Sequence, residues 1–274
     1  MSDPDYIHGA APEEQRRLSA LNDLINEAAL RELRLGGGEK ILDVGCGLAQ
    51  FTRAMARAAG PRGGALGIER DPQQLDSARR LAREAGEGAH LELREGDAQA
   101  LPLSGEEWGS FDLAHARFLL EHVPDPLSVV RGMVRSVRPG GRIVLADDDH
   151  DVLRLWPEPP GVMDAWRAYM ETYTRLGNDP LVGRRLVALL HEAGASPLRN
   201  TWLFFGSCAG DPALATIVAN MAEILEGARE EIHANSGFEP ARLAAAVETL
   251  RAWGKRPDAS YWYAICWAEG RRAG

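Results

Sequence analysis

The alternation of short apolar runs with amphipathic segments between residues 38 and 150 constrains the fold of this chain more than any other feature. Two Asp-Pro pairs, Asp71-Pro72 and Asp125-Pro126, are typical of helix starts, because the aspartate caps the helix and the proline suits its first turn. Strands that alternate with helices require crossover connections, so the pattern predicts an α/β protein with a parallel sheet covered on both faces. The predicted strands lie at 41–44, 65–69, 91–94, 111–114 and 142–146.

The chain divides into three expected regions. Residues 1–37 form an N-terminal arm and an amphipathic helix, which is either a lid over the site or an oligomer contact. Residues 38–150 form the sheet core, and residues 151–274 supply the rest of the sheet. An exchange of the N-terminal helix between subunits would give a homodimer or a higher homo-oligomer.

The rhythm changes after residue 150, where aromatic-rich helical segments separate the late strands. We expect these strands at 201–205 and 260–267, and we expect them to close the sheet. The segments at 151–182 and 208–257 are interpreted as helical cap insertions that cover one end of it.

Composition excludes several classes of protein. A formal net charge of -9 argues against nucleic-acid binding, which needs a basic face. No apolar stretch reaches the roughly 20 residues of a membrane span, and the acidic start does not resemble a secretory signal. Three widely spaced cysteines fit a reduced compartment, so we expect a cytoplasmic protein that is bound to neither membrane nor nucleic acid.

A glycine-rich turn follows the first predicted strand and precedes a helix. Gly45 and Gly47 let the backbone turn sharply and approach a ligand, which sheets of this kind bind at the carboxyl ends of their strands. A dinucleotide fingerprint would need glycine where Gln50 stands, and Asp43 would be unfavourable beside a pyrophosphate. S-adenosylmethionine (SAM) has no phosphate and carries a sulfonium and an ammonium cation, which suit an acid at Asp43.

Two further acids end the next strands. Glu69 ends the second strand, where its carboxylate can accept hydrogen bonds from both ribose hydroxyls. Asp97 follows the third strand, where it can accept from the adenine amino group while the Ala98 N–H donates to the ring. Three acids on one rim of a sheet are difficult to explain as solvated surface.

The chain resembles class I SAM-dependent methyltransferases, in particular the small-molecule branch that is similar to ubiquinone and menaquinone biosynthesis enzymes. The matching stretches cover roughly residues 38–150, and they are ILDVGCGLAQFT, GIERDPQQLDSAR, REGDAQALPL, FDLAHARFLLEHVPDP and VRPGGRIVLADDD. The resemblance implies a doubly wound, Rossmann-like sheet of seven strands, mostly parallel, with the last strand antiparallel.

The same resemblance implies where the cofactor binds and which product it leaves, S-adenosylhomocysteine. It places Ala116, Arg117 and Phe118 along the methionine part. Ala49 departs from the family, which often has a third glycine there, but alanine is small enough to fit. The implied SAM contacts are Asp43, Gly45, Gly47, Glu69, Asp97 and Ala98. Gln50 and Arg70 flank the site, where they either touch the cofactor or are solvated.

Two histidines are candidates for a general base. His150 leaves the fifth strand at the ligand-bearing rim, and His122 follows the fourth strand. His122 either faces the acceptor or cofactor or anchors its loop, and His150 is either a general base or a residue of a solvated loop. We predict no metal ion, because the adjacent ligands in the run from Asp148 to Asp151 rarely build an octahedral site alone.

These observations predict a methyltransferase that acts on a small, apolar or aromatic metabolite by in-line transfer to an O, N or C atom. Such a reaction needs mainly positioning and exclusion of water, so an obvious catalytic residue is not required. One alternative is a non-catalytic SAM-binding regulator or scaffold. A second alternative is a nicotinamide-dependent oxidoreductase.

Overall fold

The computed structural model describes residues 25–274, which form two compact units. The core unit comprises residues 25–148, 182–203 and 266–274, and the cap unit comprises residues 149–181 and 204–265. The segments expected as cap insertions, 151–182 and 208–257, overlap the two segments of the cap unit. The strand expected at 260–267 is instead two strands, of which Ser260–Trp262 pairs in the small sheet of the cap unit and Ala264–Arg272 joins the main sheet. The expected arm and the first part of the N-terminal helix lie outside the described residues, whereas residues 25–33 are helical.

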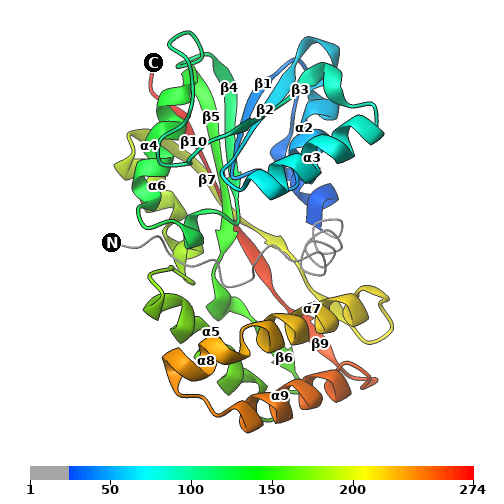
Figure 1. Cartoon of the computed structure of the whole chain (residues 1–274). Coiled ribbons are helices and arrows are strands. Elements are labelled where there is room, and N and C mark those ends of the chain that lie inside the picture. Colours follow the sequence, from blue (N-terminus) through cyan, green and yellow to red (C-terminus); the bar gives the residue numbers. More distant parts are fainter. Residues whose placement is uncertain (1–24) are drawn as a thin grey trace. The chain divides into compact units, whose positions relative to one another are not determined.

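The core unit contains a seven-stranded sheet in the order β3-β2-β1-β4-β5-β10-β7 (Figure 1). The five strands of the expected core occupy one side of it, in the order that a doubly wound fold requires. All four pairings among these five strands are parallel. The strands are β1 (Lys40–Val44), β2 (Gly64–Glu69), β3 (Leu91–Glu95), β4 (Phe111–Arg117), β5 (Val137–Asp148), β7 (Ala195–Phe204) and β10 (Ala264–Arg272).

The last strand, β10, lies between β5 and β7 and runs antiparallel to β5. Arg142 on β5 donates to Glu269 over 3.0 Å, and Arg272 donates to the carbonyl oxygen of Val137 over 2.7 Å. Residue numbers therefore rise along β10 as they fall along β5. The predicted fold class, a mostly parallel seven-stranded sheet, is confirmed.

Helices cover the sheet on both sides, with α2 and α3 on one side and α4 and α6 on the other (Figure 1). The two Asp-Pro pairs start helices as predicted. The Asp71 carboxylate accepts from the N–H groups of Gln73 and Gln74, and the Asp125 carboxylate accepts from Ser128. The helices are α2 (Gln50–Ala59), α3 (Pro72–Glu84), α4 (Pro126–Ser136) and α6 (Leu186–Glu192).

The start of β5 differs from the prediction. We expected Pro139-Gly140-Gly141 to separate a helix from a strand that begins at Arg142. The strand instead begins at Val137, which pairs with Phe111, whereas Arg142 pairs with Leu113. The intervening residues form a bulge, a feature that tolerates proline and glycine within a strand.

The cap unit has its own sheet and its own apolar core. Its small sheet has the order β6-β9-β8, with antiparallel pairing. Buried aliphatic and aromatic side chains from all four helices form one cluster with Leu155 and Tyr261 of this sheet. The elements are β6 (Arg154–Trp156), β8 (Ser207–Cys208), β9 (Ser260–Trp262), α5 (Val162–Arg175), α7 (Ala213–Gly227), α8 (Arg229–Ser236) and α9 (Pro240–Trp253).

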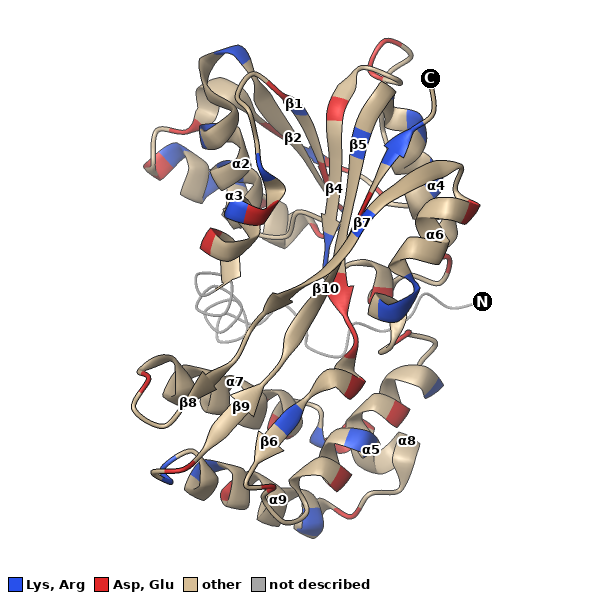
Figure 2. Ribbon diagram, turned by 180° about the vertical axis from the view of Figure 1, so that it is seen from behind, with Lys and Arg blue, Asp and Glu red and all other residues tan. Residues whose placement is uncertain are grey.

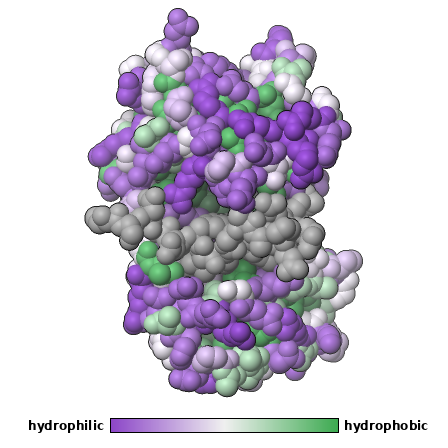
Figure 3. All heavy atoms as spheres, in the orientation of Figure 1, coloured by the Kyte–Doolittle hydropathy of each residue, from purple (hydrophilic) through white to green (hydrophobic). Residues whose placement is uncertain are grey.

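The surface carries mixed charge. Basic and acidic residues are interspersed over both units in Figure 2, and hydrophilic residues dominate the face of the core unit seen in Figure 3. Within residues 25–274, no helix combines the length and the apolar character needed to cross a bilayer.

Candidate cofactor and catalytic site

The glycine turn joins β1 to α2 and is anchored to the neighbouring strand. Gly45 and Gly47 have φ angles of 72° and 53°, a left-handed conformation that favours glycine. The N–H groups of Gly45 and Cys46 both donate to the carbonyl oxygen of Ile68, over 2.9 and 3.0 Å. A Cβ atom at Gly45 would lie 2.9 Å from a methyl carbon of Leu119. The left-handed conformation therefore favours glycine at position 45, and a larger residue there would also have to displace the Leu119 side chain.

Ala49 ends the turn, and Gln50 begins α2. Ala49 is fully buried, so its methyl group fits, as expected from its size. Its backbone, however, is left-handed, with φ 56° and ψ 23°. This conformation costs an L-residue roughly 1–2 kcal/mol, a cost that glycine does not carry. The departure from the family pattern therefore has an energetic consequence that side-chain size alone does not reveal.

Glu69 connects the turn to the start of α3. One of its carboxylate oxygens accepts from the Gly47 N–H over 2.9 Å. The other accepts from the N–H groups of Arg70 and Asp71, over 2.9 and 3.0 Å. Charge-assisted bonds of this kind are strong, and each carboxylate oxygen has more than one acceptor site. Glu69 is thus held in a fixed orientation and keeps the capacity to accept from a ligand.

The loop after β3 lies against the end of β2. The Gly96 N–H donates to the Glu69 carbonyl oxygen over 3.0 Å. Asp97 follows Gly96 in the sequence and therefore lies near the Glu69 backbone. The exposed Asp97 carboxylate accepts from the Gln99 N–H over 2.8 Å, and Ala98 is half-buried. The turn glycines, Glu69 and the Asp97 loop therefore form one connected rim, as the sequence predicts.

Asp43 is placed differently from the rim acids. Its carboxylate is buried, accepts from the Thr52 hydroxyl over 2.5 Å and lies 2.7 Å from His115 Nδ1. Asp43 and His115 are partners in the register of β1 and β4. We expected Asp43 to contact the SAM cations, and this stays a prediction for a carboxylate that is buried and has one protein partner at each oxygen. The role of His115 was missed because only strand register identifies it.

Arg117 ends β4 beside this buried pair, directly after the buried Ala116. Its guanidinium carbon lies 4.5 Å from the Phe51 ring centroid, and it donates to the side-chain oxygen of Asn26 over 2.8 Å. Burial lowers the pKa of Arg117 to about 10, against the raising influence of Asp43 and Asp148. Arg117 therefore remains a cation at neutral pH, at the place where the resemblance expects the methionine part.

Cys46 lies within the turn, and its chemistry is suppressed. Burial raises the pKa of the thiol well above its usual range, and the nearby carboxylates of Asp43 and Glu69 raise it further. A nucleophilic cysteine needs the opposite shift. Cys46 is therefore a small residue that fits the turn, in agreement with the absence of metal-ligand spacing in the sequence.

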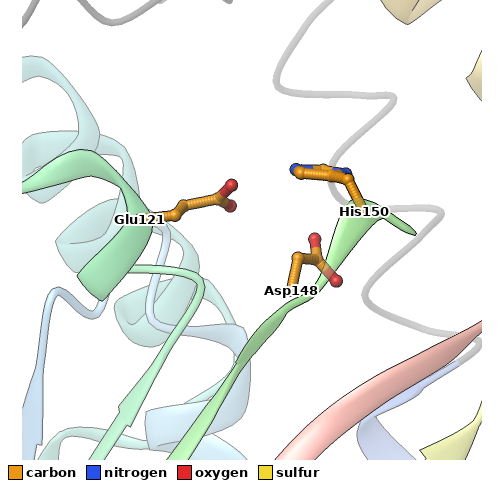
Figure 4. A group of neighbouring side chains, drawn as sticks. All are labelled: Glu121, Asp148 and His150. Atoms are coloured by element: carbon orange, nitrogen blue, oxygen red, sulfur yellow. The ribbon is translucent and has the colours of Figure 1, made fainter. Parts of the chain in front are cut away.

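Acidic residues gather where β5 ends and the short helix η3 (Leu120–His122) begins. Buried Asp147 accepts from the backbone N–H groups at 119, 120 and 148, and burial together with Glu121 raises its pKa well above the usual range. Glu121 and Asp148 project toward the same space, with ligand atoms within 4.8 Å of one another (Figure 4). His122 Nε2 lies 3.3 Å from a Glu121 oxygen, which supports the loop-anchor interpretation of His122.

His150, which is also drawn in Figure 4, belongs to the cap unit and begins the short helix η4 (His150–Val152). The Tyr263 hydroxyl lies 3.2 Å from its Nδ1 atom. The imidazole is buried, and its centroid lies 5.4, 5.8 and 5.6 Å from the rings of Trp166, Tyr169 and Tyr173. The side chain is thus fixed by a hydrogen bond and by three edge contacts rather than solvated in a loop.

The aromatic residues after residue 150 fall into two groups. Trp166, Tyr169 and Tyr173 are buried in the core of the cap unit. Trp156 and Phe204 are 69% and 61% exposed. The sequence pattern did not separate the buried aromatic residues from the exposed ones, because the two faces of a strand can carry the same types of residue.

Part of this chain is similar in sequence to known proteins. The family model described as "Methyltransferase domain" matches residues 42–145. A demethylmenaquinone methyltransferase of Bacillus velezensis is 30% identical over 173 residues, which cover 60% of this chain and 70% of that protein. An uncharacterized transposon protein of Streptomyces fradiae is 33% identical over 159 residues, 57% of this chain and 43% of that protein. The chain thus spans less than half of the length of that relative.

Solved structures share the fold at low identity. The geranyl diphosphate C-methyltransferase of Streptomyces coelicolor has a TM-score of 0.55 and 16% identity, with coverage of 99% of this chain and 91% of that chain. The [4+2]-cyclase SpnF has a TM-score of 0.54 and 24% identity, with coverage of 99% and 86%. At these identities the likeness establishes the fold alone.

The family model covers the stretch that holds the glycine turn and the rim acids, and the Bacillus relative is similar over 60% of the chain. The chain belongs to the class I SAM-dependent methyltransferases. The prediction of this family, and with it of a SAM-dependent methyltransferase, is confirmed.

Proposed function

We propose that this chain binds SAM at the rim of the core unit and transfers its methyl group to a hydroxyl oxygen of a small acceptor. The observation that carries the proposal is the Glu69 carboxylate, which the N–H groups of Gly47, Arg70 and Asp71 hold in one orientation. A carboxylate fixed in this way at the end of β2 suits a pair of ribose hydroxyls.

The rim residues fit the parts of SAM by their chemistry. Glu69 would accept from the ribose, Asp97 from the adenine amino group, and the Ala98 N–H would donate to the ring. Gly45 and Gly47 allow close approach of the backbone. Gln50 and Arg70 flank this position.

The methionine part of SAM carries both a carboxylate and cations. The buried cation of Arg117, next to Ala116, suits the carboxylate. Asp43 would act through Thr52 and His115, because its two oxygens are engaged with them. Asp43 then maintains the base of the turn and adds negative charge beneath it, without a direct bond to the ligand.

His150 is the proposed proton acceptor. SAM, held by the rim residues, would supply an electrophilic methyl group whose leaving group is the neutral thioether of S-adenosylhomocysteine. The acceptor oxygen forms the new bond to carbon, and its proton passes to His150. The Tyr263 hydroxyl at Nδ1 fixes the imidazole orientation, which leaves Nε2 as the basic atom when Nδ1 carries its proton. His122 remains a second candidate, although its contact with Glu121 favours an anchoring role.

Calorimetric titration with SAM and with NADH tests the class of ligand. Micromolar binding of SAM and no heat with NADH are expected, and the reverse would establish the oxidoreductase alternative. Release of S-adenosylhomocysteine with a panel of hydroxylated aromatic acceptors tests catalysis. SAM binding without release of that product from any acceptor would favour the regulator or scaffold alternative.

The roles of His150 and Tyr263 are tested by the pH dependence of kcat. His150→Gln should lower kcat by about 100-fold, the range of a lost general base, with the SAM affinity unchanged. Tyr263→Phe should change the pH profile of kcat rather than the affinity. An unaltered kcat in His150→Gln would remove His150 from the mechanism.

A further inference from the structure

A cavity of about 430 Å³ lies at the edge of the main sheet opposite the cofactor rim, and we call it the Lys40 cavity. It is lined by the first residues of β1, β2 and β3, which are neighbours in the sheet (Figure 1). Because these strands are parallel, the glycine turn and Glu69 lie at the other edge, where the strands end. All residues that line the cavity belong to the core unit. The Lys40 cavity is thus a separate site with the volume of a small-molecule pocket.

Lys40 and Arg62 supply the positive charge of this cavity. Lys40 Nζ donates to the Ser110 hydroxyl over 2.7 Å and lies 4.6 Å from the centroid of the Phe111 ring, another residue of the lining. Arg62 is exposed, and within residues 25–274 neither cation forms an ion pair with a carboxylate. His90 also lines the cavity, and a histidine ring can donate a further hydrogen bond. The cavity thus gathers donors whose charge is not balanced by an ion pair among the described residues.

A second hollow at the same edge of the sheet shows the usual arrangement. It measures about 370 Å³, and its Arg138 donates to the Asp112 carboxylate in the same lining over 2.7 Å. Glu92 lines the Lys40 cavity, but Arg94 donates to its carboxylate over 3.1 Å, so its charge is already balanced. In a chain with a formal net charge of -9, two unbalanced cations in one cavity favour an anionic ligand there.

We propose that the Lys40 cavity binds a phosphate monoester with a small apolar or aromatic group. Lysine and arginine both bind phosphate oxygens through charge-assisted hydrogen bonds, and a dianion matches two cations better than a carboxylate does. The buried side chains of Ala65, Leu66 and Phe111 line the same cavity and suit the apolar group. This site goes beyond the proposed methyl transfer, because none of its residues belongs to the cofactor rim.

Isothermal calorimetry with three probes tests the class of ligand. Phenyl phosphate carries both features, benzoate has the ring with a single charge, and inorganic phosphate has no ring. At low ionic strength, where exposed charges are least screened, phenyl phosphate should bind with a Kd of roughly 0.1–1 mM. Benzoate and inorganic phosphate should each bind about tenfold more weakly, because each lacks one of the two features.

Three variants that each remove one cation locate the binding site. Lys40→Met and Arg62→Met should each weaken phenyl phosphate binding by about tenfold or more, because each removes a charge-assisted bond. The matched control is Arg271→Met. Arg271 is exposed and lines the second hollow at the same edge of the sheet, so this variant should keep the wild-type Kd.

Protection from acetylation tests the same site without a substitution, so it does not depend on the folding of a variant. The chain has two lysines, Lys40 and Lys255. At about ten times its Kd, phenyl phosphate should slow the reaction of Lys40 with acetic anhydride about tenfold, as mass spectrometry of the peptides measures. The reaction of Lys255, which is exposed in the cap unit, should keep its rate.

Four results would overturn the proposal. They are the absence of heat with phenyl phosphate, equal binding of benzoate and phenyl phosphate, the same Kd in Lys40→Met and Arg62→Met as in Arg271→Met, and equal acetylation rates of Lys40 with and without the probe. Binding at the cofactor rim would give the third and fourth results, because Lys40 and Arg62 lie at the opposite edge of the sheet.

Discussion

The core unit and the cap unit assemble their functional residues in different ways. In the core unit, the rim is made by backbone groups at strand ends, with Glu69 bound to the N–H groups of its neighbours Arg70 and Asp71 and to that of Gly47 in the turn after β1. In the cap unit, His150 is held by side chains from α5 and from Tyr263, more than a hundred residues away. A rim built from local backbone rules can be recognised in a sequence, whereas a cluster built from distant side chains cannot.

The same contrast exists between two acids of the core unit. Glu69 is the last residue of β2, and Asp43 is the penultimate residue of β1, just before the glycine turn, so both positions suggest ligand contact. Glu69 is half-buried and bonded to backbone donors, whereas Asp43 is buried and bonded to the side chains of Thr52 and His115. Position at a strand end thus predicts the location of an acid but not the direction of its carboxylate.

The largest effect is expected from Glu69→Ala. The change removes the bonds proposed to the ribose and releases the Gly47, Arg70 and Asp71 amides, so SAM affinity should fall by about 100-fold. Isothermal calorimetry measures it. Glu84→Ala, an exposed carboxylate at the end of α3, is the control and should bind SAM normally. Equal affinity in the wild type and in Glu69→Ala would refute the rim as the cofactor site.

Asp43→Asn tests whether the buried acid belongs to the rim. Loss of a charged, hydrogen-bonded partner beside His115 should lower the free energy of unfolding by about 2 kcal/mol, read from urea denaturation. SAM affinity should stay within about threefold of the wild type. Thr52→Val removes another member of the same buried group and should likewise affect stability alone. A tenfold or larger loss of SAM affinity in Asp43→Asn would show a direct contact and return Asp43 to the rim.

The predictability of the molecule follows from these contacts. Helix starts at Asp71 and Asp125, the glycine turn and the rim order of Glu69 and Asp97 all depend on a few neighbouring residues, so the sequence was sufficient. The bulge that draws Pro139 into β5 depends on pairing with β4, which local signals do not encode. His115 and Tyr263 acquire their roles only through long-range packing, and their residue types carry no local signal of it.

Acid should weaken the core unit through Glu107. Arg94 donates to both Glu107 oxygens over 2.9 Å, and this pairing is the main cause that lowers the pKa of Glu107 to about 2, from 4.5. Because the folded-state pKa is lowered, the stabilisation is present above pH 4.5 and is lost as the pH falls through about 2.

Glu107→Gln should therefore remove about 1 kcal/mol at neutral pH and flatten the loss of stability below pH 4.5. Urea midpoints measured at several pH values give both quantities. Glu106→Gln, which changes the exposed neighbour of Glu107, is the matched control. Its stability should fall with decreasing pH as that of the wild type does. If the stability of Glu107→Gln falls with decreasing pH as steeply as that of the wild type, other carboxylates cause the acid sensitivity.

The smallest effect is expected at Ala49, which has the left-handed backbone conformation that usually favours glycine. Its left-handed backbone costs roughly 1–2 kcal/mol, whereas glycine removes that cost but gains freedom in the unfolded chain worth roughly 0.5–1 kcal/mol. Ala49→Gly should thus stabilise the fold by a net amount of about 0.5 kcal/mol, which a urea titration resolves. Ala59→Gly, at a buried helical position, should destabilise it instead. If Ala49→Gly destabilises the fold as much as Ala59→Gly does, the packing of the buried Ala49 methyl group outweighs the backbone strain. The conformation of this turn would then depend on side-chain contacts, as the position of His150 in the cap unit does.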